Sequence, residues 1–107
     1  MKREFHHIGI PSTLERSGET YMESISLFVT DPMQSDQKIE WLRFEKGSSM
    51  PALIQNEAHL AFLVDNVEDA MKGKECLVEP FDAGPGVRVG FVTEEGQPIE
   101  YLSIASA

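Results

Sequence analysis

The chain has 107 residues, enough for one domain with a modest core. Eighteen acidic residues against nine basic ones give a net charge of −9, which argues against a nucleic-acid or anionic-membrane partner, because both need basic patches. The single cysteine excludes an intrachain disulfide, and the apolar runs are too short for a membrane span or a signal peptide, so a reducing cytoplasm is the expected location.

The first half of the chain shows strand patterns but leaves little room for a helix. FHHIGIP, beginning at Phe5, is an apolar run with two adjacent histidines, and ISLFVTD and KIEWLRFE are two further expected strands. After the first strand, Ser12 and Glu15 could cap one helical turn before Gly18 ends it. A full helix does not fit here, and one strand is expected to be merged or missing.

The second half predicts the order strand, helix, strand, strand, strand. AHLAFLVD alternates like a strand, and DNVEDAMKGK is a helix of about two turns in which Asp65 and Glu68 resemble a capping box and Gly73 ends the helix. ECLVEP is a strand that stops at Pro80, with Cys76 as a buried packing residue, and FDAGPG is a loop. VRVGFVTE and PIEYLSIA are strands joined by a turn at EEGQ.

Three short matches recur in the same order in both halves of the chain. HIGI, beginning at His7, matches HLAF, beginning at His59; FVT occurs once in each half; and IEWL matches IEYL. Three matches in the same order indicate two copies of one structural unit within a single domain. The first module is expected over residues 1–54 and the second over residues 55–107.

The repeat aligns two pairs of polar residues, His7 with His59 and Glu40 with Glu100. Successive strand side chains point to opposite faces, so His6, which has no counterpart, is expected to be solvated or at an interface. Each aligned residue starts a strand face that is otherwise apolar or small, where a carboxylate is costly unless it is paired or binds a metal. Imidazole and carboxylate are suitable ligands for divalent transition metals, so the four residues are predicted to bind one such ion.

These motifs resemble those of the vicinal oxygen chelate superfamily, which includes glyoxalase I, methylmalonyl-CoA epimerase, extradiol dioxygenases and fosfomycin and bleomycin resistance proteins. HHIGI, HLAFLVDNVEDA and VGFVTEEGQPIEYL carry the resemblance, which covers the second half well and the first half thinly. The resemblance implies an α+β fold in which two paired βαβββ-type modules, the first abbreviated, form a U-shaped mixed sheet around a cleft. The ligand set looks like that of bacterial glyoxalase I, whereas the epimerase pattern usually has glutamine where Glu40 stands.

The resemblance implies a small metal-dependent enzyme, a glyoxalase I-like lyase or isomerase. It would act on a small oxygenated metabolite through a metal-stabilised enediolate or enolate, with Zn, Ni, Co, Mn or Fe as the divalent ion. Glu100 is the first choice for the catalytic base and Glu40 the second. The alternatives are a non-catalytic small-molecule binding or resistance protein of the same fold, an iron-dependent dioxygenase, and a short chain that has lost catalysis.

A homodimer is also expected, because the first module has no predicted helix to cover its second sheet face. That face carries the apolar residues Ile8, Ile10, Ile39 and Trp41. Exposure of a contiguous apolar patch is unfavourable, and a second subunit related by twofold symmetry is the simplest cover. The alternative cover is the loop of residues 12–24. Apart from a second subunit, the expected partner is a small-molecule substrate or ligand.

Overall fold

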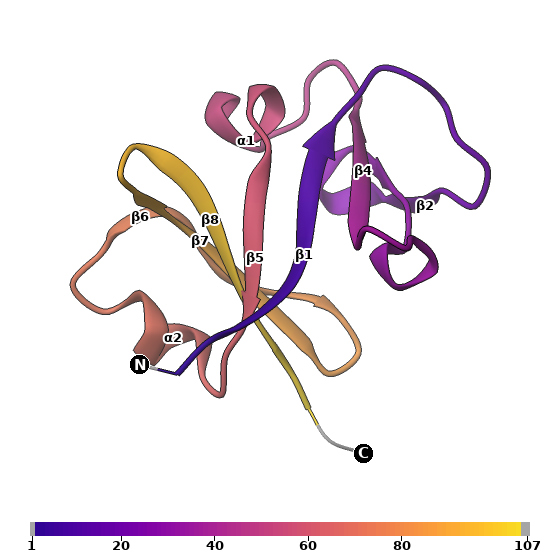
Figure 1. The fold of residues 1–107 in the computed structure, drawn as a ribbon. Helices are drawn as coiled ribbons and strands as arrows, with labels where there is room; N and C mark the ends of the chain where they lie inside the picture. The colour runs from indigo at the N-terminus through magenta and orange to yellow at the C-terminus, as the bar shows by residue number, and fades with distance from the viewer. Residues whose placement is uncertain (1, 106–107) are drawn as a thin grey trace. The chain divides into compact units, whose positions relative to one another are not determined.

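The computed structural model describes residues 2–105, and the chain divides into two compact units (Figure 1). The N-terminal unit is His7–His59, and the C-terminal unit joins the residues up to His6 to those from Leu60 onward. Short helices accompany mixed β-sheet in this chain, which confirms the predicted α+β class.

Four strands and one short α-helix make up the N-terminal unit. The elements are β1 (Glu4–Pro11), β2 (Thr20–Met22), β3 (Leu27–Val29), β4 (Ile39–Phe44) and α1 (Ala52–Asn56), with 3-10 helices at Glu23–Ile25 and Pro32–Gln34. The strand order is β2-β3-β4-β1, with β1 parallel to β4 and the other neighbours antiparallel. Leu27, Leu42, Met50 and Ile54 are its buried apolar residues.

The connection from β1 to β2 contains no helix, so the helical turn predicted at Ser12 and Glu15 is wrong (Figure 1). The hydroxyl of Ser12 instead accepts a hydrogen bond from the backbone N–H of Leu14 at 3.2 Å. Such a local bond offers the backbone an alternative to a helix. The expected loss of a strand is also wrong, because the three-residue strand β2 follows this loop.

The C-terminal unit has the predicted order of elements. They are β5 (His59–Leu63), α2 (Val67–Met71), β6 (Glu75–Gly84), β7 (Val87–Glu94) and β8 (Gln97–Ile104), with His59 itself counted in the N-terminal unit. The strand order is β5-β8-β7-β6, with β5 parallel to β8 and the other neighbours antiparallel. The helix α2 packs one apolar face on the sheet, in a core formed by Val64, Val67, Ala70, Val92, Ile99 and Tyr101.

The N-terminus of α2 is capped by a different residue from the one predicted. The side chain of Asn66, rather than that of Asp65, accepts a hydrogen bond from the backbone N–H of Asp69 at 2.8 Å. Asn66 precedes the first helical residue, where a side-chain acceptor satisfies an otherwise unpaired backbone donor. The predicted end of the helix is confirmed, because Gly73 adopts a positive φ of 76° just beyond it.

The predictions for the chain around Pro80 are wrong. Strand β6 continues through Pro80 to Gly84, so most of the expected loop FDAGPG is strand. Proline is tolerated because β6 has only β7 beside it, and the pairing of the two strands shifts register between Val78 and Phe81. Cys76, which was expected to be buried, is exposed on this same strand.

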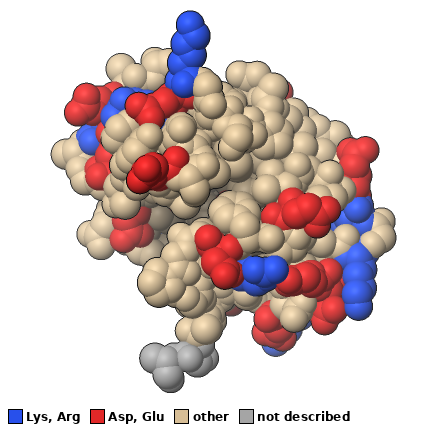
Figure 2. Space-filling model, turned by 180° about the vertical axis from the view of Figure 1, so that it is seen from behind, with Lys and Arg blue, Asp and Glu red and all other residues tan. Residues whose placement is uncertain are grey.

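Acidic and basic side chains are interspersed on the molecular face shown in Figure 2, and no broad basic area appears on it. This distribution agrees with the negative net charge of the whole chain. Within residues 2–105, no helix has the length and apolar character needed to cross a membrane.

Candidate metal site

Three of the four predicted ligands come together within the N-terminal unit. His7 lies on β1, Glu40 lies on the adjacent parallel strand β4, and His59 is the first residue of β5. Each offers one ligand atom, and these atoms lie within 4.8 Å of one another. Nε2 of His7 is 3.5 Å from Oε1 of Glu40, and the rings of His7 and His59 meet edge to face with centroids 6.1 Å apart.

The burial and chemistry of these three residues fit a divalent metal ion. His7 and His59 are only 3% and 2% exposed, and the side chain of Glu40 is 20% exposed. Bonds of about 2.1 Å to nitrogen or oxygen require ligand atoms within about 4.2 Å of one another. The observed spacing, at most 4.8 Å, is close to this limit, so small side-chain movements would close the three residues around an ion of this size.

Gly9 makes room for one of the two imidazoles. A β-carbon at Gly9 would lie 2.3 Å from Cε1 and 2.5 Å from Nε2 of His59. Real β-carbons essentially never approach another heavy atom this closely, so a side chain at position 9 would displace the ring. The sequence signal for this requirement is the glycine in HIGI, but a glycine in a strand does not by itself show which side chain it accommodates.

Glu100 lies in the C-terminal unit, on β8, and is 6% exposed. Its register partner on the parallel strand β5 is Ala61, which is fully buried and stands two residues after His59. In the N-terminal unit, Glu40 has the same relation to Gly9, which stands two residues after His7. Each glutamate therefore lies opposite a small residue that shares a strand face with a histidine.

Two further expectations concern the repeat. His7 is buried whereas His6 is only partly buried, as expected if the two side chains leave β1 on opposite faces. The FVT match does not mark equivalent positions, because Phe28 pairs with Arg43 on β4 whereas Phe91 pairs with Glu100 on β8. The histidines and glutamates are therefore equivalent in register, and the FVT tripeptides are not.

Comparison with known proteins adds information about the fold alone. No protein-family model matches the chain, and no curated protein does so. Among solved structures, the chain is similar to the crystal structure of hypothetical protein BH1468 from Bacillus halodurans C-125, with 19% sequence identity and a TM-score of 0.73. The match covers 100% of this chain and 98% of that one. At this identity the similarity shows a common fold, and function has to be argued from the site.

Proposed function

We propose that this chain is a small metal-dependent enzyme of the glyoxalase type, a lyase or isomerase acting on a small oxygenated metabolite. The observation that supports the proposal most directly is the cluster of two buried imidazoles and one carboxylate in the N-terminal unit. We propose Glu100 as the fourth ligand. It lies opposite Ala61 on β5, just as Glu40 lies opposite Gly9 on β1, so the two glutamates hold equivalent register positions.

A metal explains this cluster better than a simple ion pair does. The distance from Nε2 of His7 to Oε1 of Glu40 is 3.5 Å. A charge-assisted hydrogen bond is usually shorter, at roughly 2.7–2.9 Å. Two buried histidines side by side would also repel each other if both were protonated. Neutral imidazoles around a divalent ion avoid both difficulties, because the ion attracts all three ligands.

The chain's own residues would supply proton transfer. A bound divalent ion supplies Lewis-acid stabilisation of the negative charge that develops on substrate oxygens. Glu100 is the first choice for the base, because a carboxylate that is 6% exposed can hold the substrate proton away from bulk water. Glu40, with a more exposed side chain, is the second choice.

An iron-dependent dioxygenase is the second candidate. One observation favours it, namely that the N-terminal unit by itself brings together two histidines and one carboxylate. That composition is the one found in non-haem iron oxygenases, where the remaining positions stay open for oxygen and substrate. The presence of a second glutamate at the equivalent register position counts against this candidate.

Metal analysis followed by a proton-exchange assay tests the proposal. Protein purified without chelator should contain about one divalent ion per chain. If no such ion is found, the proposal loses its basis. NMR in D2O should then show deuterium uptake into members of a panel of small α-oxo and α-hydroxy carbonyl compounds, and Glu100→Gln should abolish the uptake. Oxygen consumption in place of exchange would identify the dioxygenase, and ligand binding without either reaction would identify a binding protein.

A further inference from the structure

A cavity lies on the face of β4 opposite the one that carries Glu40. It has a volume of ≈ 350 Å³ and belongs entirely to the N-terminal unit. Its walls are residues 16–18 of the loop after β1, Thr30, Asp31, Gln34 and Ser35 around the second 3-10 helix, and Ile39 and Trp41 of β4. Ile39 and Trp41 flank Glu40 in the sequence, so their side chains leave the strand on the opposite face from that ligand.

The cavity lies beside the segment that corresponds to a helix in the other unit. In the C-terminal unit, the first two strands in chain order, β5 and β6, are connected through α2, which packs on its sheet. In the N-terminal unit, β1 and β2 are connected by a loop, and this loop provides one wall of the cavity. The missing helix therefore leaves a hollow rather than a filled core.

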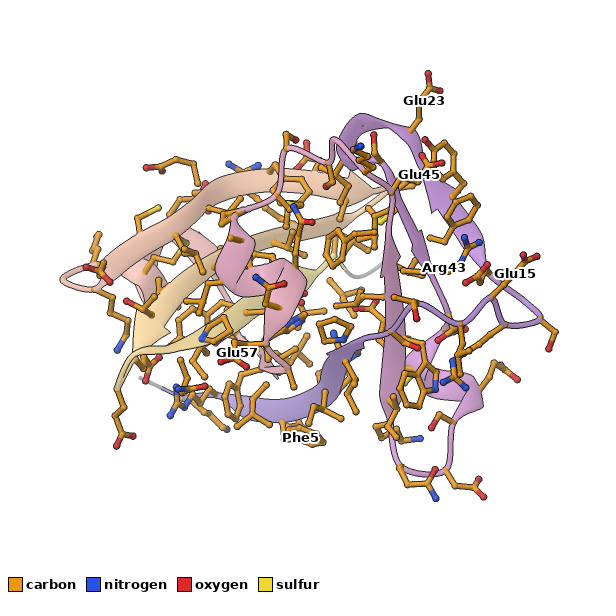
Figure 3. All side chains as sticks on the ribbon, turned by 90° about the horizontal axis from the view of Figure 1, so that it is seen from above. Phe5, Glu15, Glu23, Arg43, Glu45 and Glu57 are labelled. Carbon is orange, nitrogen blue, oxygen red and sulfur yellow. The ribbon has the colours of Figure 1, made fainter. Side chains whose placement is uncertain are left out.

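The guanidinium group of Arg16 lies in this wall and has no carboxylate oxygen within 4 Å in the described part of the chain, although its charge acts on Glu19 from farther away. It stacks on the ring of Trp41 at 3.7 Å, and its buried Nε–H has no hydrogen-bond acceptor within residues 2–105. The neighbouring Arg43, labelled in Figure 3, differs, because it donates to both carboxylate oxygens of Glu19 at 2.9 and 2.7 Å. Stacking on an aromatic ring leaves the edge of a guanidinium free to pair with a planar carboxylate.

The hydroxyl groups of Thr30 and Ser35 add hydrogen-bond donors to the same cavity. Thr30 Oγ1 accepts the backbone N–H of Trp41 at 2.9 Å, and Ser35 Oγ accepts that of Ile39 at 3.2 Å. A hydroxyl that accepts a backbone hydrogen bond keeps its own proton for donation. Asp31 also lines the cavity, but it is exposed and its Oδ1 accepts the backbone N–H of Met33 at 2.9 Å.

We infer that this cavity binds a small organic carboxylate. The acid group pairs with the edge of the Arg16 guanidinium and with the two hydroxyls, while the carbon chain lies against Ile39 and Trp41. The volume is within the range of about 300–1,000 Å³ that is usual for small-molecule sites. None of the metal ligands lines the cavity, so this inference stands independently of the proposed function.

Tryptophan fluorescence provides a direct test, because Trp41 is the only tryptophan in the chain. Sodium butyrate is the probe, butyramide is its uncharged counterpart, and sodium chloride keeps the ionic strength constant. Butyrate should cause a saturable change in the emission of Trp41, and butyramide should not. Absence of a saturable response, or an equal response to butyramide, would overturn the inference.

Arginine variants show whether Arg16 forms the site. Arg16→Gln should weaken butyrate binding by about tenfold or more, because a charge-assisted hydrogen bond is lost. The matched control is Arg88→Gln, since Arg88 lies in the C-terminal unit and already donates to Glu68 at 2.9 Å. Unchanged affinity in a folded Arg16→Gln protein would exclude this arginine as the binding group.

A measurement on the unaltered chain covers the case in which Arg16→Gln does not fold. The NMR signal of one arginine Nε–H should shift as butyrate is added, and no shift would count against the site. The fluorescence titration should also give the same result after treatment with a chelator. Loss of butyrate binding on metal removal would show that the butyrate response comes from the metal site instead.

Discussion

Gly9 lies directly against the imidazole of His59, with no room for a β-carbon between them. Both residues belong to the N-terminal unit, so strand β1 supports a predicted metal ligand within that unit. We expect Gly9→Ala to reduce stability by about 1–3 kcal/mol, the usual cost of overpacking. We also expect metal affinity to fall by about tenfold or more, as happens when support for a ligand is disturbed. Chemical denaturation and metal titration measure the two effects separately.

Gly90→Ala is a suitable control for this variant. A β-carbon at Gly90 would meet the sulfur of Met71 at 2.5 Å and Cγ1 of Val67 at 3.1 Å, in the core of the C-terminal unit. It should therefore cost stability, partly relieved by movement of the flexible Met71 side chain, while metal affinity stays the same. If both variants lost metal equally, the loss would reflect general destabilisation rather than displacement of His59.

His59→Ala should remove the metal ion. The imidazole of His59 is 2% exposed and has no neighbouring histidine that could replace it on its own strand. Elemental analysis of the variant should show less than about a tenth of the wild-type metal content. Disturbing the support of a ligand already lowers metal affinity by about 10–100-fold, and removing the ligand itself should lower it further. Full occupancy in this variant would contradict the proposed ligand set.

The two adjacent histidines should behave differently when they are replaced. His7→Ala should abolish metal binding, whereas His6→Ala should leave it largely intact, because the two side chains lie on opposite faces of β1. Metal titration of the two variants under identical conditions makes the comparison. The reverse result would mean that every face assignment of β1 is inverted.

Acid should destabilise the fold in part through Glu94. Burial opposes ionisation of this carboxyl, but the hydroxyl of Tyr101 and the cations Arg3 and Lys74 outweigh it, so the pKa of Glu94 lies below its ordinary value of 4.5. A carboxyl with a lowered pKa stabilises the folded state above pH 4.5, and this contribution disappears as the pH falls through the folded-state pKa. Denaturation at several pH values should show a shallower acid dependence in Glu94→Gln, and an identical dependence would exclude this network.

The homodimer remains a prediction, and the structure suggests a better test than replacing Trp41. An aspartate at position 41 could pair with Arg16, which lies over that ring. Ile10, the register partner of Trp41 on β1, is the better choice. We expect Ile10→Asp to shift a dimer toward monomer in sedimentation at micromolar concentration, because it would place an unpaired charge on the apolar face that is predicted to form the contact. Ile104→Asp, at a position that is 52% exposed, is the control.

That His7, Glu40 and His59 lie together could be predicted because strand parity is a local property of the sequence and the internal repeat pairs the residues. His7 and Gly9 share a strand face, and so do His59 and Ala61, so one short motif specifies both the ligand and the small residue beside it. The FVT match failed as a guide because three residues can recur without sharing a register. The capping role of Asn66 was missed because the adjacent Asp65 fits the same pattern one residue earlier.

The rest of the fold depends on contacts that the local sequence does not contain. Ser12 and Glu15 satisfy a capping pattern, but one turn is too short to form a helix without packing. Strand β2 has only three residues, and it exists because Tyr21 pairs with Phe28 on β3. The hollow beside Arg16 follows from the missing helix, so it could not be inferred before the path of this loop was known.

The course of β6 has a consequence for aggregation. This strand pairs on one side only, and its free edge carries Pro80, which has no N–H to donate, together with the exposed acidic residues Glu75, Glu79 and Asp82. Interrupted pairing, proline and like charges all make a free edge a poor template for another strand. Strand addition and fibril growth at this edge are therefore disfavoured.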